Sequence, residues 1–256
     1  MTTPVRQLPA LILAAGRGER MRPLTDTTPK PLLSVQGKPL IVWHLEALAR
    51  DGVRDVVINT AHLEDQFPAV LGDGARWGLR LHYSMEGRDH GGALETAGGM
   101  AKALPQLGEA FWVLAGDVFV PGFRFESAAA EAFVQGDDWG QMWLVPNPPH
   151  VPQGDFALDA TGRVWRKDTA PAGTPAYTYS TIGLYRPAMV AGVRAGEKAA
   201  LRPCLERAID AGKLAGRLYK GPWVDVGTPQ RLAELNDGGP ASPLMAAPAA
   251  PSAPSA

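Results

Sequence analysis

The first residues of this chain whose types and spacing could do chemistry are two glycines and an arginine. Gly16, Gly18 and Arg20 occur in AAGRGERMRPLT, directly after the apolar segment LPALIL. Glycine permits a tight turn in which backbone N–H groups approach phosphate oxygens closely, and a guanidinium can donate to two such oxygens at once. The turn predicts a binding site for a phosphate-bearing ligand, although many glycine turns are only structural.

Two common phosphate-binding patterns are excluded for this turn. Met21 stands where the dinucleotide fingerprint GxGxxG requires its third glycine, which packs the helix closely against the strand. The P-loop pattern GxxxxGK[ST] does not occur in the chain. The sequence therefore argues against a Rossmann dehydrogenase and against a P-loop enzyme.

A lysine follows in the same loop, between two prolines. Lys30 lies in TTPKPLL. Each proline fixes its own φ and restricts the residue before it, so we expect Lys30 on a stiff, extended backbone that holds its ammonium near one place. Alone, such a lysine could simply be solvated. Its position just after the glycine turn favours a second cation for the same phosphates.

Two aspartates follow apolar segments far apart in the chain. Asp117 ends FWVLAGD, and Asp225 lies in GPWVDVGTPQRL. Mg²⁺ prefers hard oxygen ligands and commonly takes one or two carboxylates together with phosphate oxygens and water. A lone aspartate at a strand end can equally be a cap or turn residue, and the sequence alone does not bring the two together.

Apolar runs alternate with helical spacings, which predicts the elements that position these residues. We expect strands over 8–15, 53–59, 79–84 and 111–117, with helices over 39–51, 62–71 and 94–104. Further strands are expected over 141–147, 162–168, 177–185 and 221–227, with a helix over 202–212. The pattern predicts a single α/β domain over 8–236, with a mostly parallel central sheet, helices on both faces and a small substrate flap. Ligands of such sheets bind at the carboxyl ends of the strands.

Composition narrows the class of protein further. The 45% of hydrophobic residues suffice for a sizeable core, and 25 basic residues against 26 acidic ones provide no field for nucleic acid or membrane. The run over 11–15 is too short to span a bilayer. Cys204 is the only cysteine, which fits a reducing, cytoplasmic compartment. Residues 237–256 are rich in Pro, Ala and Ser, and we expect them to be disordered. The sequence does not indicate an oligomeric state.

The segment LILAAGRGERMRPLTDTTPKPLLSVQGKPLI resembles the signature of the sugar-1-phosphate nucleotidyltransferases, in which GxGxRM is followed by PKP and GKP. The resemblance implies a Rossmann-like nucleotidyltransferase fold, with Arg20 and Lys30 catalytic and with Asp117 and Asp225 on one Mg²⁺. It implies a nucleotide-binding role for these residues: Ala15, Gly16, Gly18, Glu19, Gly98 and Gly99.

Two further segments resemble one branch of that family. LETAGG is similar to the LETxGG of members that use UTP, and NPPHVPQGDFAL is similar to the NPxHxPxGDF of N-acetylmuramate α-1-phosphate uridylyltransferases. The second similarity implies that Asp155 places the sugar. Both segments could instead be structural, one a helix start and the other a turn entering a strand. The chain departs from the branch by AGD in place of NGD, by Ala97 in place of a glycine, and by a longer loop over 88–92.

The implied reaction joins UTP, or another nucleoside triphosphate, to a sugar 1-phosphate with release of pyrophosphate. A phosphate monoester is mostly dianionic at pH 7 and needs no general base, so alignment and charge neutralisation would carry catalysis. N-acetylmuramate 1-phosphate is the leading sugar, and mannose 1-phosphate with GTP is an alternative. A non-catalytic nucleotide sensor on the same fold is a third possibility, although such a module would be expected to lose a metal carboxylate or the phosphate arginine.

Overall fold

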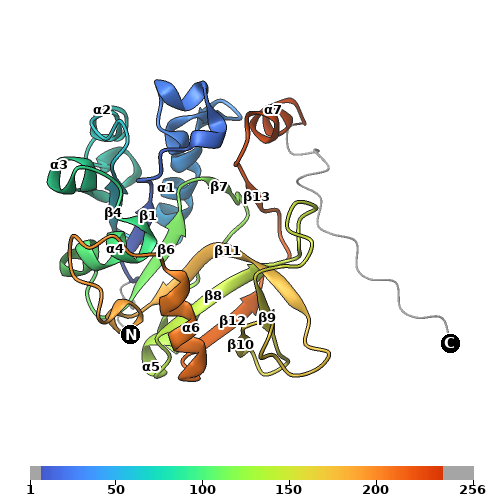
Figure 1. Ribbon diagram of the computed structural model, residues 1–256. Coiled ribbons are helices and arrows are strands. Elements are labelled where there is room, and N and C mark those ends of the chain that lie inside the picture. The colour runs from blue at the N-terminus through green and yellow to red at the C-terminus, as the bar shows by residue number, and fades with distance from the viewer. Residues whose placement is uncertain (1–6, 239–256) are drawn as a thin grey trace, which may run out of the picture.

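Four strands form the parallel half of the central sheet in the computed structural model, which describes residues 7–238 (Figure 1). They lie in the order β6-β1-β4-β5, and each neighbouring pair is parallel. Parallel neighbours must be joined by crossover connections, which are usually helices. The alternation of apolar runs and helices along the first half of the chain supplies these connections. The four strands are β1 (Ala10–Leu13), β4 (Asp55–Thr60), β5 (Arg80–Met85) and β6 (Phe111–Ala115).

Strand β11 (Ala176–Tyr185) joins this parallel half to the rest of the nine-stranded sheet. It pairs antiparallel with β6 and with β8 (Gly140–Val145), and β12 (Leu214–Leu218) runs parallel to β8. The start of β11 pairs with β9 (Phe156–Leu158), which forms a small hairpin with β10 (Val164–Trp165).

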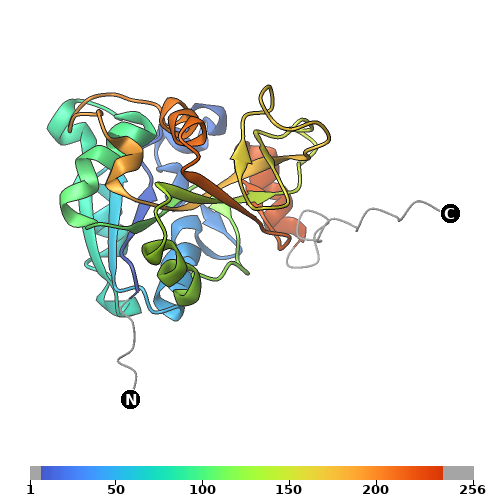
Figure 2. The ribbon, with the colours of Figure 1, turned by 90° about the horizontal axis from the view of Figure 1, so that it is seen from below.

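Helices cover both faces of the sheet, because successive strand residues point to opposite sides. Ile12 packs in a cluster with α1 (Leu40–Arg50), α2 (Gln66–Leu71) and α5 (Ser127–Gln135). Its neighbour Leu11 packs in a second cluster with α4 (Glu95–Ala103) and α6 (Arg202–Asp210). Figure 2 shows α6 in orange on one side of the sheet and α1 in blue on the other.

A third apolar cluster lies beside the site described below. It packs α7 (Pro229–Gly238) against β2 (Ser34–Val35), which pairs with β3 (Lys38–Pro39). The cluster also includes residues of β7 (Val118–Phe119) and β13 (Val224–Asp225), which form a two-stranded antiparallel sheet. This cluster holds the end of the described chain against the loops that follow β1 and β6.

The structure confirms the predicted α/β fold with a mostly parallel central sheet. The sequence did not predict the helices α3 (Glu86–His90), α5 and α7, nor the strands β2, β3, β7, β9 and β12. The predicted strand over 221–227 contributes only the two residues of β13, outside the central sheet. Helix α7 continues to Gly238, and the rest of the predicted tail, 239–256, lies outside the described residues. No helix in the described part combines the length and apolar character that a membrane span requires.

Candidate active site

The glycine turn leaves the sheet where three strands end together. Leu13 of β1 lies opposite Asn59 of β4 and Ala115 of β6, and the amide of Gly116 donates to the carbonyl of Leu13 at 2.8 Å. The turn after β1 and the loop after β6 therefore emerge at the same edge of the sheet, at the carboxyl ends of the strands, as predicted.

The two glycines of the turn serve different purposes. Gly18 has a φ of 66°, and a Cβ there would lie 3.0 Å from Thr25 Cγ2 and 3.2 Å from Lys30 Cβ. Only glycine adopts this conformation without strain in so little space. A Cβ on Gly16 would meet no atom within 4 Å. Gly18 therefore shapes the turn, while Gly16 leaves open space beside it.

That open space belongs to a cavity of about 880 Å³ at this edge of the sheet. The structure gathers around it eight of the residues that the sequence predicted for the site, from the glycine turn, the lysine loop, the end of β6 and the start of β9. They are Ala15, Gly16, Gly18, Glu19, Arg20, Lys30, Asp117 and Asp155.

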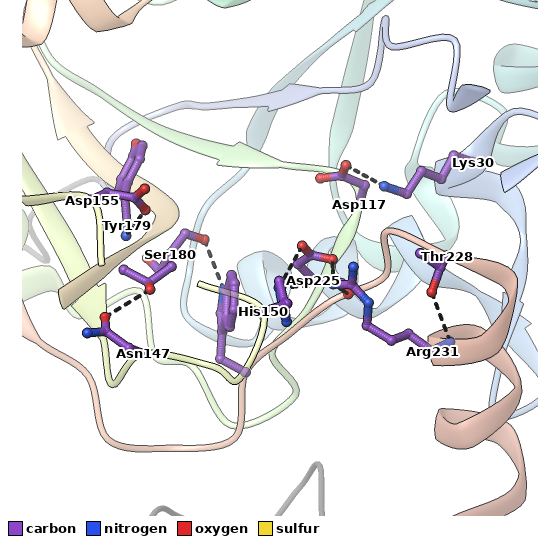
Figure 3. A network of polar contacts seen from close by, with 12 residues as sticks. Lys30, Asp117, Asn147, His150, Asp155, Tyr179, Ser180, Asp225, Thr228 and Arg231 are labelled. Carbon is purple, nitrogen blue, oxygen red and sulfur yellow. Dashed lines mark hydrogen bonds and ion pairs between the residues drawn. The ribbon is translucent and has the colours of Figure 1, made fainter. Parts of the chain in front are cut away.

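Lys30 and Asp117 form an ion pair within this cavity. Lys30 begins the single 3-10 turn Lys30–Leu32 between its two prolines and is 8% exposed. Its Nζ lies 2.7 Å from Asp117 Oδ2 (Figure 3). The backbone of PKP is not extended as expected but forms this 3-10 turn, which holds the ammonium beside a carboxylate at the cavity.

The two predicted metal ligands lie close together, Asp225 at the end of β13 and Asp117 in the turn just before β7. Asp225 of β13 pairs with Val118 of β7, and the amide of Val226 donates to the carbonyl of Asp117 at 3.0 Å. Asp117 and Asp225 stand 108 positions apart in the sequence, yet they are adjacent across this short ladder. The sequence alone did not bring Asp117 and Asp225 together, but the backbone hydrogen bonds between their two segments do.

Asp225 is held by two further side chains that the sequence did not single out. Its carboxylate accepts a hydrogen bond from Arg231 of α7, and His150 Nε2 lies 3.3 Å from its Oδ2. Partial burial tends to raise the pKa of Asp225, but the hydrogen bond and charge of Arg231, with the charges of His150 and Lys30, lower it below its usual value. Asp225 therefore stays ionised at neutral pH. His150 could have been found, because it is the histidine of NPPHVPQGDF.

Gly227 makes room where Arg20 and Asp225 meet. A Cβ at this position would lie 2.7 Å from Asp225 Oδ1, 3.1 Å from Arg231 Nη2 and 3.4 Å from Arg20 Nη2. Gly227 also lines the cavity, although Asp225 does not. The segment VDVGTPQRL thus places the carboxylate of Asp225 and the guanidinium of Arg231 near Arg20. Gly227, which has no side chain, leaves the room for these groups.

The donor set at this edge fits a magnesium ion. Asp117 and Asp225 are partly exposed, with side-chain exposures of 43% and 29%, and the backbone ladder of β7 and β13 holds them near each other. Mg²⁺ takes one or two carboxylates and completes its shell with water and substrate oxygens. A divalent cation would compete with Lys30 for Asp117, while Arg231 holds the carboxylate of Asp225 in place.

Asp155 lies at the other end of the polar network drawn in Figure 3. Its amide donates to the carbonyl of Tyr177 at 2.8 Å, and its Oδ2 accepts from the amide of Tyr179 at 2.9 Å. The carboxylate is thus fixed by β11 while it lines the cavity. This placement suits a residue that contacts a second substrate.

Gly98 and Gly99 do not line the cavity, in contrast to their predicted contact with the nucleotide. Both are buried in α4. A Cβ on Gly98 would lie 2.2 Å from the carbonyl oxygen of Glu197, and one on Gly99 would lie 2.5 Å from Asn59 Nδ2. The two glycines allow close packing of α4. The neighbouring part of the cavity is lined instead by Ala93, Glu95 and Thr96.

The space at Gly99 is filled by a buried polar network that the sequence did not reveal. Glu86 is 0% exposed and accepts from Asn59 Nδ2 at 2.8 Å and from the amide of Leu94 at 2.7 Å. Asn59 in turn accepts from the amide of Ala14 at 2.7 Å. Burial raises the pKa of Glu86. The network connects the start of the glycine turn, at Ala14, to the loop before α4, at Leu94. The same buried side chains therefore position both of these sides of the cavity.

Comparison with known proteins agrees with this geometry. A model of the family described as nucleotidyl transferase matches residues 9–239. The chain is 47% identical to the N-acetylmuramate alpha-1-phosphate uridylyltransferase of Neisseria meningitidis serogroup B, over 88% of this chain and 95% of that protein. It is 32% identical to the protein of the same name from Caulobacter vibrioides, over 86% of this chain and 92% of that one. The solved structure of the inositol-1-phosphate CTP transferase from T. maritima has a TM-score of 0.69 at 19% identity, covering 91% of this chain and 96% of that one. The chain therefore belongs to the nucleotidyl transferase family of enzymes, as the motifs around Gly16 and Lys30 predict.

Proposed function

We propose that this protein transfers a uridylyl group from UTP to a sugar 1-phosphate and releases pyrophosphate. The observation that carries the proposal is the cavity in which the glycine turn, Arg20, Lys30 and Asp117 meet beside Asp225. N-acetylmuramate 1-phosphate is the leading sugar, because the relative that is 47% identical over nearly its whole length carries that name. The product would then be UDP-N-acetylmuramate, and the reaction would serve peptidoglycan recycling in the cytoplasm.

The charges of the site suit an in-line transfer. An oxygen of the sugar phosphate attacks the α-phosphorus of UTP, the bond from that phosphorus to the bridging oxygen breaks, and pyrophosphate leaves. The attacking phosphate is already mostly dianionic at pH 7, so no residue has to remove a proton. Arg20 and Lys30 offset the negative charge that crowds around the α-phosphorus. Gly16 lets backbone N–H groups approach the triphosphate, since nothing fills the space beside it.

Asp117 and Asp225 are the residues that would hold Mg²⁺. When bound, the ion supplies further charge neutralisation and fixes the orientation of the phosphate oxygens. Lys30 pairs with Asp117 in the structure, so the phosphate-binding cation and a carboxylate that would hold the metal lie side by side.

A grid of substrates tests the proposal. Pyrophosphate release is measured for UTP, GTP, CTP and dTTP, each combined with the 1-phosphates of N-acetylmuramate, N-acetylglucosamine, glucose and mannose, with Mg²⁺ present. We expect the highest kcat/KM for UTP with N-acetylmuramate 1-phosphate. Turnover with GTP and mannose 1-phosphate but not with UTP would favour the guanylyltransferase alternative. A protein that binds UTP and turns over no combination would be the non-catalytic sensor.

A further inference from the structure

One wall of the cavity lies apart from the glycine turn and is built from β9, β11 and α6. This second wall contains one acidic, several apolar and two hydroxyl-bearing residues, and a single cation among the described residues that line it. Its members are Asp155, Phe156, Tyr179, Thr181, Leu201, Arg202 and Leu205. Arg20 and Lys30, which would bind the phosphates, lie on the side of the cavity formed by the glycine turn. Arg202 lies on the second wall, and the proposed transfer gives it no group to bind.

Arg202 is positioned by its neighbours rather than buried. It is the first residue of α6, and its side chain is 50% exposed. Its guanidinium carbon lies 4.6 Å from the ring centroid of Phe156, which follows Asp155 directly. Such a contact holds a guanidinium near the ring face. The cation therefore stands close to the residue predicted to place the sugar.

The present partner of Arg202 is easily exchanged. Its Nε lies 2.8 Å from Glu206 Oε1, one helical turn further along α6, and both side chains are partly exposed. An exposed pair of this spacing contributes little to stability. A carboxylate on a bound substrate can replace Glu206 at small cost, because a guanidinium binds carboxylates through two parallel hydrogen bonds.

We propose that Arg202 binds a carboxylate carried by the sugar, and that the protein thereby selects acidic sugar 1-phosphates over neutral ones. The inference rests on the proposed function. N-acetylmuramate carries a lactyl ether whose carboxylate is ionised at pH 7, and N-acetylglucosamine lacks that group. In the bound sugar, the 1-phosphate faces Lys30 and Arg20, and the carboxylate faces Arg202 across the second wall. Arg202 is a specificity residue and takes no part in the bonds that form and break.

The test compares wild type with Arg202→Leu on three sugar 1-phosphates at saturating UTP and Mg²⁺. These are N-acetylmuramate 1-phosphate, its carboxamide, in which the lactyl carboxylate is neutral, and N-acetylglucosamine 1-phosphate. We expect Arg202→Leu to raise KM for the acid about 10- to 100-fold, the loss of a charge-assisted hydrogen bond, with kcat little changed. KM for the two neutral substrates and KM for UTP should change less than about twofold. Arg202→Lys should fall between wild type and Arg202→Leu.

Glu206→Gln is the matched control, because it removes the present partner of Arg202 and leaves the guanidinium in place. Its KM for the acid should stay equal to that of wild type or fall. Thermal melting of all variants checks that α6 remains folded.

Three other outcomes separate this inference from the proposed function. An equal loss with all three sugars would assign Arg202 to the phosphate and overturn the inference, while the uridylyl transfer stands. A wild type that prefers N-acetylglucosamine 1-phosphate would also overturn it. If UTP supports no turnover, the proposed function is wrong, and calorimetric binding of N-acetylmuramate 1-phosphate decides the inference: weaker binding by Arg202→Leu supports it, and equal binding overturns it.

Discussion

The ammonium of Lys30 lies 2.7 Å from Oδ2 of Asp117, although 87 positions separate the two residues in the chain. Lys30 is almost fully buried, while the Asp117 side chain is 43% exposed. The carboxylate thus presents one side to a cation of the protein and remains accessible from the cavity. This asymmetry suits a carboxylate that would hold a metal ion on its accessible side.

Asp117→Asn should lower kcat at least about 100-fold, because the amide cannot supply the negative charge that a divalent cation requires. The Mg²⁺ concentration for half-maximal activity should rise. The melting temperature should change little, because the amide oxygen of the asparagine can still accept a hydrogen bond from the buried ammonium of Lys30. Asp26→Asn is the matched control, because Asp26 forms an exposed pair with Arg22 and does not line the cavity. Unchanged turnover and unchanged Mg²⁺ dependence in Asp117→Asn would refute the metal assignment.

The two glycines of the turn offer a paired experiment. Gly18→Ala should lower the free energy of unfolding by about 1–2 kcal/mol or more, because an alanine at positive φ is strained and its Cβ would press on Thr25. Gly16→Ala should leave stability within about 0.5 kcal/mol, since its Cβ meets no atom. It should instead raise KM for UTP by filling space beside the phosphates. Urea unfolding and initial rates measure both effects, and a Gly16→Ala enzyme with wild-type KM would place the triphosphate elsewhere.

Arg231 should act on activity through Asp225. Arg231→Gln removes the cation that holds this carboxylate, and we expect the affinity for Mg²⁺ to fall about 10- to 100-fold, as is common when a group that orients a metal ligand is removed. Titration of activity with Mg²⁺ at fixed UTP measures the change. Arg194→Gln is the control, because that side chain is 89% exposed and pairs only with Glu197 among the described contacts. An identical Mg²⁺ titration in both variants would separate Asp225 from the metal.

Local patterns were sufficient to predict the parallel half of the fold. Apolar runs such as FWVLAGD and helical spacings such as those over 39–51 depend on neighbours in the sequence, and the structure confirms these elements. The same holds for Gly18, whose positive φ is typical of glycine. The extended backbone expected at Lys30 is wrong, because this residue begins a 3-10 turn that packing stabilises against the preference of a residue before proline. Helix α5 and strand β12 were missed because their residues, in SAAAEAFVQ and LAGRL, show no strong period and depend on tertiary packing.

The parts of the site that depend on contacts between distant segments could not be predicted from spacing. Gly99 looked like a ligand-facing glycine, but it makes room for Glu86 and Asn59, which lie in other elements. Arg231 lies only six positions from Asp225, but its contact with the carboxylate depends on where α7 begins, and His150 reaches Asp225 from the loop before β9. Arg202 was missed because a helix-starting arginine carries no signal until β9 places Phe156 beneath it.

His44 predicts how stability depends on pH. This α1 residue is 2% exposed, and its Nε2 has no hydrogen-bond partner among the described residues. Burial lowers the pKa of His44 to about 4, against the opposing effects of a backbone hydrogen bond with Val118 and the charge of Asp117. An unfolded histidine has a pKa of about 6.5. Between these values the unfolded chain binds a proton that the native protein does not, so stability is lost as the pH falls below about 6.5.

The size of this effect is about 2 kcal/mol between pH 7.5 and pH 5, since each unit of pKa difference is worth about 1.4 kcal/mol. Urea unfolding of wild type and His44→Gln at the two pH values measures it. The variant should lose less stability than wild type over this interval by about that amount, whatever its stability at pH 7.5. His82→Gln, at an exposed histidine of β5, should keep the pH dependence of wild type. If His44→Gln and wild type lost equal stability, the pKa of His44 in the native protein would have to equal that of an unfolded histidine, and the burial argument would be wrong.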